Sequence, residues 1–121
     1  LPGRRIVFTN GDVPHAERAM ERLGIGHHFE AIFGIVESDY IPKPEPVVYD
    51  RLLQRHGIAG SKAAMFEDIA RNLKPAKERG MTTVWIEGGS PYAAAGADDG
   101  YIDHRAPELT PWLVELAGRL G

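Results

Sequence analysis

The chain has 121 residues, of which 43% are hydrophobic and 26% are charged, and its formal net charge is -3 at pH 7. This composition is typical of one globular domain with a real core, and the slight negative charge gives no general attraction to nucleic acid or to an anionic membrane. The chain contains no cysteine, which excludes disulfides, thiolate catalysis and cysteine metal sites. No apolar run reaches membrane-spanning length and no signal peptide is recognisable, so we expect a cytoplasmic protein.

Short apolar strands alternate with amphipathic helices along the chain. Pro14 and Gly24 mark the beginning and the end of the first helix, and Gly57 ends the second. The sequence predicts strands at residues 6–9, 31–36, 63–66 and 82–86 with a brief fifth at 101–102, and helices at about 14–23, 46–56 and 73–79 and after Thr110. Strand–helix alternation with short links predicts an α/β fold with a parallel sheet.

Polar groups that suit phosphoryl chemistry follow three consecutive strands. Thr9 and Asn10 end the first strand, Lys43 lies in the proline-rich loop after the second, and Glu67 and Asp68 end the third. The carboxyl ends of parallel strands meet at one edge of a sheet, where α/β proteins bind their ligands. A hydroxyl and an amide can bind phosphoryl oxygens, a lysine supplies positive charge, and a carboxylate pair suits Mg²⁺.

Each of these residues also has a simpler structural explanation when it is taken alone. Thr9 and Asn10 can close a turn, Lys43 can be a solvated loop lysine, and Asn72 can cap a helix. Glu67 and Asp68 can simply begin a helix, where its dipole favours acids. It is their joint occurrence at successive strand ends that favours a functional site.

The ordered motifs resemble those of the haloacid dehalogenase-like (HAD) hydrolases, and most of all the pyrimidine 5′-nucleotidase-like branch. They are Val7-Phe8-Thr9-Asn10-Gly11, then Lys43-Pro44-Glu45-Pro46 followed by Tyr49, then Phe66-Glu67-Asp68 with Asn72. The resemblance implies a three-layer Rossmann-like core and hydrolysis of a small phosphorylated substrate, such as a nucleotide, with Mg²⁺ as cofactor.

The resemblance also implies a role for each matching residue. Thr9 binds the phosphoryl group, and Lys43 steadies charge on the nucleophile and the phosphate. Glu67 and Asp68 lie at Mg²⁺, with Asp68 the better candidate for a direct ligand. Asn72 has a supporting role.

One departure from the family pattern is serious, because the family's first motif, a strand ending in Asp-x-Asp, does not occur in the sequence. That motif supplies the nucleophile and precedes the Thr motif, with the helical cap domain between the two. Residues 1–121 are therefore interpreted as the incomplete, C-terminal portion of a HAD-like core domain. We expect the isolated chain to be inactive. We also expect its sheet to lack a central strand, so that the strands beside the gap either pair directly or accept a strand from another copy or from a lost N-terminal segment.

Two other functions compete with the phosphatase interpretation. A receiver-type phospho-acceptor domain uses similar residues, but there the acids come first in the chain and the lysine last. A non-catalytic interaction module that keeps the HAD fold is favoured for the isolated chain by the missing nucleophile. The five histidines show no metal-ligand spacing and are interpreted as surface or loop residues, whereas Trp85 is expected in the core and Trp112 against the last helix.

Overall fold

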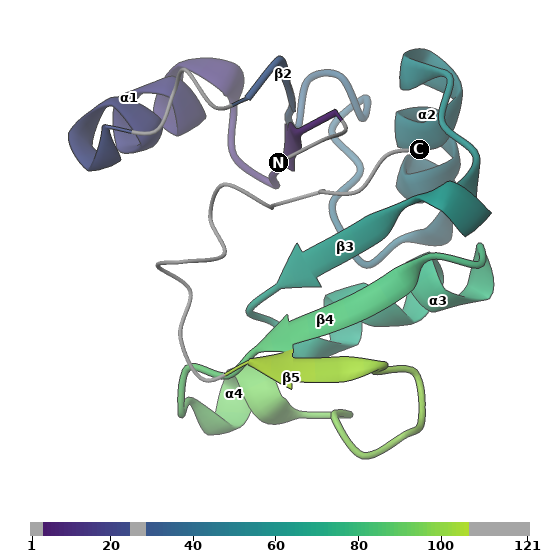
Figure 1. Ribbon diagram of the computed structural model, residues 1–121. Helices are drawn as coiled ribbons and strands as arrows, with labels where there is room; N and C mark the ends of the chain where they lie inside the picture. The colour runs from purple at the N-terminus through teal and green to yellow at the C-terminus, as the bar shows by residue number, and fades with distance from the viewer. Residues whose placement is uncertain (1–3, 25–28, 107–121) are drawn as a thin grey trace.

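The structure, a computed structural model, describes residues 4–24 and 29–106 (Figure 1). The predicted helix after Thr110, with Trp112, lies outside the described residues. The strands are β1 (Ile6–Phe8), β2 (Ala31–Phe33), β3 (Ala64–Glu67), β4 (Thr82–Ile86) and β5 (His104–Ala106). The helices are α1 (Val13–Leu23), α2 (Pro46–His56), α3 (Lys74–Glu78) and α4 (Pro91–Ala94), with 3-10 turns η2 (Gly60–Lys62) and η3 (Ala70–Leu73). The predicted α/β fold with parallel strands is confirmed.

Local sequence signals account for the ends of the first two helices. The Asp12 side chain accepts a hydrogen bond from the His15 amide at 2.8 Å and so caps α1. Gly24 and Gly57 end α1 and α2 with φ angles of 68° and 64°. These left-handed conformations favour glycine because they cost a residue with a Cβ atom. The predicted positions of these helix ends are confirmed.

The strands form two separate parallel sheets, one with the order β1-β2 and the other with the order β3-β4-β5. In the first sheet Val7 lies opposite Ile32, and in the second Phe66 lies opposite Val84. The second strand ends at Phe33, earlier than predicted, because the Glu37 carboxylate accepts from the Gly34 amide at 2.9 Å and the chain turns away.

The fifth strand lies at residues 104–106, and its prediction at Tyr101–Ile102 is wrong. Tyr101 is buried, and its carbonyl oxygen accepts from the Thr83 hydroxyl at 2.6 Å. The Asp103 carboxylate in turn accepts from the Thr83 amide at 2.8 Å. These side-chain bonds to Thr83 take the place of a regular ladder, which begins only after Asp103.

The main core lies between the sheets and the helices that pack against them. Its fully buried members include Phe33 of β2, Tyr49 of α2 and Leu73 of η3. Trp85 is 5% exposed, which confirms its predicted place in the core. Its ring nitrogen donates to the carbonyl oxygen of Asp68 at 3.0 Å, so this core residue also anchors the chain just beyond β3. No helix within residues 4–24 and 29–106 has the length and hydropathy needed to cross a bilayer.

The facing edges of β1 and β3 are not joined by hydrogen bonds among the described residues. The Thr9 amide donates to Phe33 of β2, and successive residues of a strand direct their backbone groups to opposite sides. The backbone of Ile6 and Phe8 is therefore directed away from β2, and that of Ala64, by the same reasoning, away from β4. The predicted alternative in which the two strands pair directly does not occur.

The prediction that His56 is a surface residue is wrong for its ring. The Nε2 atom is buried and makes no hydrogen bond with the described residues. Its ring packs edge-on against Phe33, with 6.3 Å between the ring centroids. Burial, and then the positive charges of Arg4 and Arg55, lower the pKa of His56 below its ordinary value of 6.5, although Glu30 opposes them. The folded protein therefore favours the neutral imidazole.

This lowered pKa predicts that the free energy of unfolding falls as the pH is lowered through 6.5 towards the folded-state pKa of His56. The unfolded chain binds a proton there that the folded chain resists, so acid favours unfolding. Urea unfolding between pH 8 and pH 5 measures the effect. His56→Phe should flatten the dependence in this window. An equal dependence in wild type and His56→Phe would contradict the assignment.

Candidate active site at the carboxyl ends of the strands

Lys43 joins the carboxyl ends of the two sheets. Its ammonium nitrogen lies 2.8 Å from Glu67 Oε2 at the end of β3 and 3.0 Å from the carbonyl oxygen of Phe8 in β1. It also lies 4.8 Å from the centre of the Phe8 ring. The side chains of Lys43 and Glu67 are only 7% and 8% exposed. Lys43 is therefore a buried, paired cation, and the interpretation as a solvated loop lysine is wrong.

The loop that carries Lys43 is held against the end of β1. Gly34 lies so close to the turn after β1 that an added Cβ atom would meet the carbonyl oxygen of Gly11 at 2.8 Å. The Ile35 amide donates to that same oxygen at 2.9 Å. Further along, Arg51 of α2 donates to the carbonyl oxygen of Ser38 at 2.9 Å. Contacts with β1 and α2 thus fix a segment that has no regular secondary structure.

Asn10 takes part in the same fixation. Its Oδ1 atom accepts from the backbone amide of Lys43 at 2.7 Å, and its Nδ2 atom lies 3.5 Å from the carbonyl oxygen of Lys43. The side-chain amide is therefore directed at the backbone of the loop. The role of Asn10 as a phosphate ligand stays a prediction from its amide group, and its contacts in the structure hold the backbone of Lys43 as a brace.

Thr9 is half-buried at the end of β1. Its Oγ1 atom accepts from the Gly11 amide at 3.0 Å, which orients the hydroxyl within the turn. A hydroxyl that accepts one hydrogen bond still has its own hydrogen to donate. Thr9 can therefore offer a donor at the edge of the sheet where the Lys43 ammonium lies.

Glu67 and Asp68 differ in exposure, although they are neighbours in the sequence. Glu67 is buried, and its second oxygen, Oε1, accepts from the Ile69 amide at 3.3 Å. Burial raises the pKa of Glu67, while the nearby Lys43 charge opposes the rise. Asp68 is exposed beyond the end of β3. The two acids therefore divide into one that pairs with the lysine and one that faces solvent.

The donor set for Mg²⁺ is incomplete in the part of the chain that the structure describes. No group of three or more His, Cys, Asp or Glu side chains there is arranged to hold a metal ion. Glu67 is buried and bonded to Lys43 and the Ile69 amide, whereas Asp68 is exposed, so the carboxylate of Asp68 is the more accessible ligand for a metal ion. Mg²⁺ in proteins is often held by one or two carboxylates together with waters and substrate phosphate. The geometry thus fits a ligand role for Asp68 and fits a lysine-pairing role for Glu67.

Asn72 does not cap a helix, so its prediction as a helix cap is wrong. It is a buried member of η3, and α3 begins at Lys74 instead. Its carbonyl oxygen accepts from the hydroxyl of Tyr49, which ties α2 to η3. Tyr49 is fully buried, and burial followed by the Glu67 charge raises its pKa. Tyr49 is thus a neutral phenol whose hydrogen bond holds η3 against α2.

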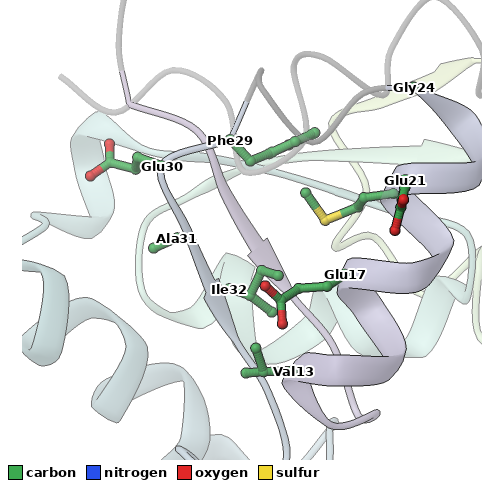
Figure 2. A pocket seen from close by; sticks show the side chains of 9 residues that line it. Val13, Glu17, Glu21, Gly24, Phe29, Glu30, Ala31 and Ile32 are labelled. Carbon is green, nitrogen blue, oxygen red and sulfur yellow. The ribbon is translucent and has the colours of Figure 1, made fainter.

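A separate hollow of about 640 Å³ lies between α1 and β2 (Figure 2). Its lining combines the apolar side chains of Val13 and Ile32 with the carboxylates of Glu17 and Glu21. None of the residues predicted to bind phosphate or metal lines it. The hollow is therefore distinct from the cluster around Lys43.

Comparison with known proteins decides the family. Residues 3–80 match the haloacid dehalogenase-like hydrolase family. The chain belongs to this family. The match includes Thr9, Lys43, Glu67 and Asp68, whose arrangement the structure shows.

Named relatives are phosphatases and dehalogenases. The chain is 31% identical over 86 residues to the fructose-1-phosphate phosphatase YqaB of Escherichia coli (strain K12), a match that covers 68% of this chain and 44% of that protein. Its fold is similar to that of a dehalogenase crystallised as an intermediate complex, with a TM-score of 0.72, 21% identity, and coverage of 93% and 48% of the two chains. A HAD phosphatase from Thermococcus onnurineus gives a TM-score of 0.68 at 21% identity, with coverage of 97% and 52%. The chain thus spans about half the length of these relatives.

Proposed function

We propose that this chain is part of a Mg²⁺-dependent phosphomonoester hydrolase whose nucleophile is supplied from outside residues 1–121. The observation that carries the proposal is the buried Lys43 ammonium, which joins the ends of β1 and β3 beside Thr9 and Asp68. Phosphoryl transfer depends mainly on positioning and charge stabilisation, which this arrangement supplies. The family match and the phosphatase among its relatives support the same reaction class.

Each residue has a definite task in the proposed reaction. The Thr9 hydroxyl donates to a phosphoryl oxygen, and the Lys43 ammonium offsets negative charge where the phosphate and the attacking carboxylate meet. Glu67 holds Lys43 in place, and Asp68 would hold Mg²⁺, which neutralises charge on phosphoryl oxygens when bound. An aspartate from the rest of the protein would form a bond to phosphorus as the bond to the leaving oxygen breaks, and water would then hydrolyse the aspartyl-phosphate.

The substrate is proposed to be a small phosphate ester. The motif resemblance favours a nucleotide, and the similarity to the fructose-1-phosphate phosphatase of E. coli favours a phosphorylated sugar. Turnover of nucleoside monophosphates and of sugar phosphates by the completed enzyme separates the two. The chain contains no cysteine and so cannot form a disulfide, the bond typical of secreted proteins. We propose a cytoplasmic location for it.

The gap between β1 and β3 is proposed to accept a strand from the half of the protein that this chain does not span. Each flanking strand is parallel to its own neighbour, β1 to β2 and β3 to β4, and an incoming strand parallel to both would join the two sheets into one. The pocket between them is lined by apolar side chains, among them Ile6, Leu52, Ala64 and Met65, and measures only about 20 Å³, so β1 and β3 would have to move apart to admit a buried apolar strand. Unpaired strand edges favour the addition of another strand. The alternative is that a strand from a second copy fills the gap. The mass in solution would then be that of a dimer.

Phosphate binding by the chain tests the site directly. Titration of orthophosphate with Mg²⁺, followed by NMR shifts, should perturb the amides of residues 9–11 and the side chain of Lys43. Thr9→Val should weaken binding about tenfold, the effect of losing one hydrogen bond to a charged group. Thr82→Val should not weaken phosphate binding, because Thr82 begins β4 and the proposed site lies at the carboxyl ends of the strands. With an aryl phosphate, the isolated chain should show no turnover.

Equal phosphate binding by wild type and Thr9→Val would contradict the assignment of the site. Turnover by the isolated chain that disappears in Asp68→Asn would show that a nucleophile within residues 1–121 had been missed.

A further inference from the structure

We infer that Asn10 is a positioning residue that fixes the Lys43 ammonium through the backbone of Lys43. The inference rests on the proposed function for the importance of Lys43, but the brace itself can be tested without any phosphate ligand. It starts from the observation that both polar atoms of the Asn10 side chain are directed at the two backbone groups of one residue.

The chemistry of the asparagine side chain fits this task. An amide carries one acceptor and one donor group, so it can match the N–H and the C=O of a single backbone residue. The bond from the Lys43 amide to Asn10 Oδ1 is short, at 2.7 Å, whereas the contact from Nδ2 to the Lys43 carbonyl oxygen is long, at 3.5 Å. The acceptor atom therefore carries most of the interaction.

The brace joins two points that lie 33 residues apart in the sequence, next to the place where the lysine is used. Asn10 follows β1 directly, and the Lys43 ammonium returns to the same strand to contact the carbonyl oxygen of Phe8. Backbone and side chain of Lys43 are thus both attached to the end of β1. Without Asn10, the direct attachment of Lys43 to the end of β1 would depend on its side-chain contact with Phe8.

The accessibility of the Lys43 amine and the hydrogen exchange of the Lys43 amide measure the brace in the full chain. We expect Asn10→Ala to raise the rate of Lys43 acylation by a small anhydride, followed by mass spectrometry, about tenfold, as the loss of one hydrogen bond implies. Exchange of the Lys43 amide should rise by a similar factor. Asn10→Asp keeps the acceptor and should restore both rates to near the wild-type values.

Asp12→Ala is the matched control, because it removes the N-cap of α1 two residues away and has no contact with Lys43. It should leave the acylation and exchange of Lys43 unchanged. The inference is overturned if Asn10→Ala leaves both rates unchanged, or if Asp12→Ala raises them as much. A protein that keeps the brace but binds no orthophosphate would instead contradict the proposed function.

Discussion

Replacing Lys43 by alanine is expected to lower the free energy of unfolding by about 3 kcal/mol at neutral pH, the usual cost of breaking a buried ion pair. The substitution leaves the Glu67 carboxylate 8% exposed without the cation that lies 2.8 Å away in the wild type. The cost is large because both members are nearly buried, whereas exposed ion pairs contribute roughly 0–1 kcal/mol.

The cost of Lys43→Ala should also depend on pH. Burial already raises the pKa of Glu67, and loss of Lys43 removes the charge that opposes the rise. A carboxyl group whose folded-state pKa is raised destabilises the protein increasingly as the pH rises from the unfolded value towards the folded one. The variant should therefore lose more stability relative to wild type at pH 8 than at pH 5.

Urea unfolding of wild type, Lys43→Ala and the double variant Lys43→Ala with Glu67→Gln measures this prediction. The double variant should recover part of the loss, because a neutral amide costs less to bury than an unpaired carboxylate. Lys77→Ala is the control, since Lys77 pairs with Asp103 at 2.6 Å while 43% of its side chain is exposed. A loss in Lys43→Ala no greater than in Lys77→Ala would contradict the role assigned to the pair.

Supplying the proposed central strand should stabilise the chain by about 5 kcal/mol, from roughly five new backbone hydrogen bonds at about 1 kcal/mol each. The groups that would gain partners are the backbone N–H and C=O groups of Ile6 and Ala64 and the amide of Phe8, which face the gap. Phe8 gains less, because its carbonyl oxygen already accepts from Lys43. The change is a large part of the net stability of a domain, which is about 5–15 kcal/mol.

Hydrogen exchange measured for each amide tests this prediction. The comparison is between residues 1–121 alone and a longer protein that also contains the proposed strand. In the chain alone, the amides of Ile6, Phe8 and Ala64 should exchange faster than that of Val7, which is directed at β2. In the longer protein they should become protected. Solution mass separates the competing explanations, since a dimer of the isolated chain would point to a strand from a second copy. A monomer whose gap-facing amides are as protected as Val7 would contradict the proposal.

The sequence by itself determined the features that depend on neighbouring residues. Apolar runs such as residues 64–66 became strands, and Asp12 and Gly24 ended α1 where capping chemistry requires. The order of Thr9, Lys43 and the Glu67-Asp68 pair along the chain was enough to predict the family, which the comparisons confirm. The strand and helix-end signals are local because each depends on backbone geometry within one turn or one strand, whereas the family signal lies in the order of short motifs along the chain.

Only the tertiary structure decided which polar side chains contact one another and which face solvent. Lys43 pairs with Glu67 across 24 residues, and Asn10 braces Lys43 across 33, so that neither contact leaves a periodic trace in the sequence. The same is true of His56, whose ring packs against Phe33 and whose pKa is lowered by burial and by the charge of Arg4, both contacts being with other parts of the chain. A side chain's partner and its exposure are set by which strands and loops come together in space. Residue type shows that Glu67 can bind a cation, but packing decides that the cation it meets is the ammonium of Lys43.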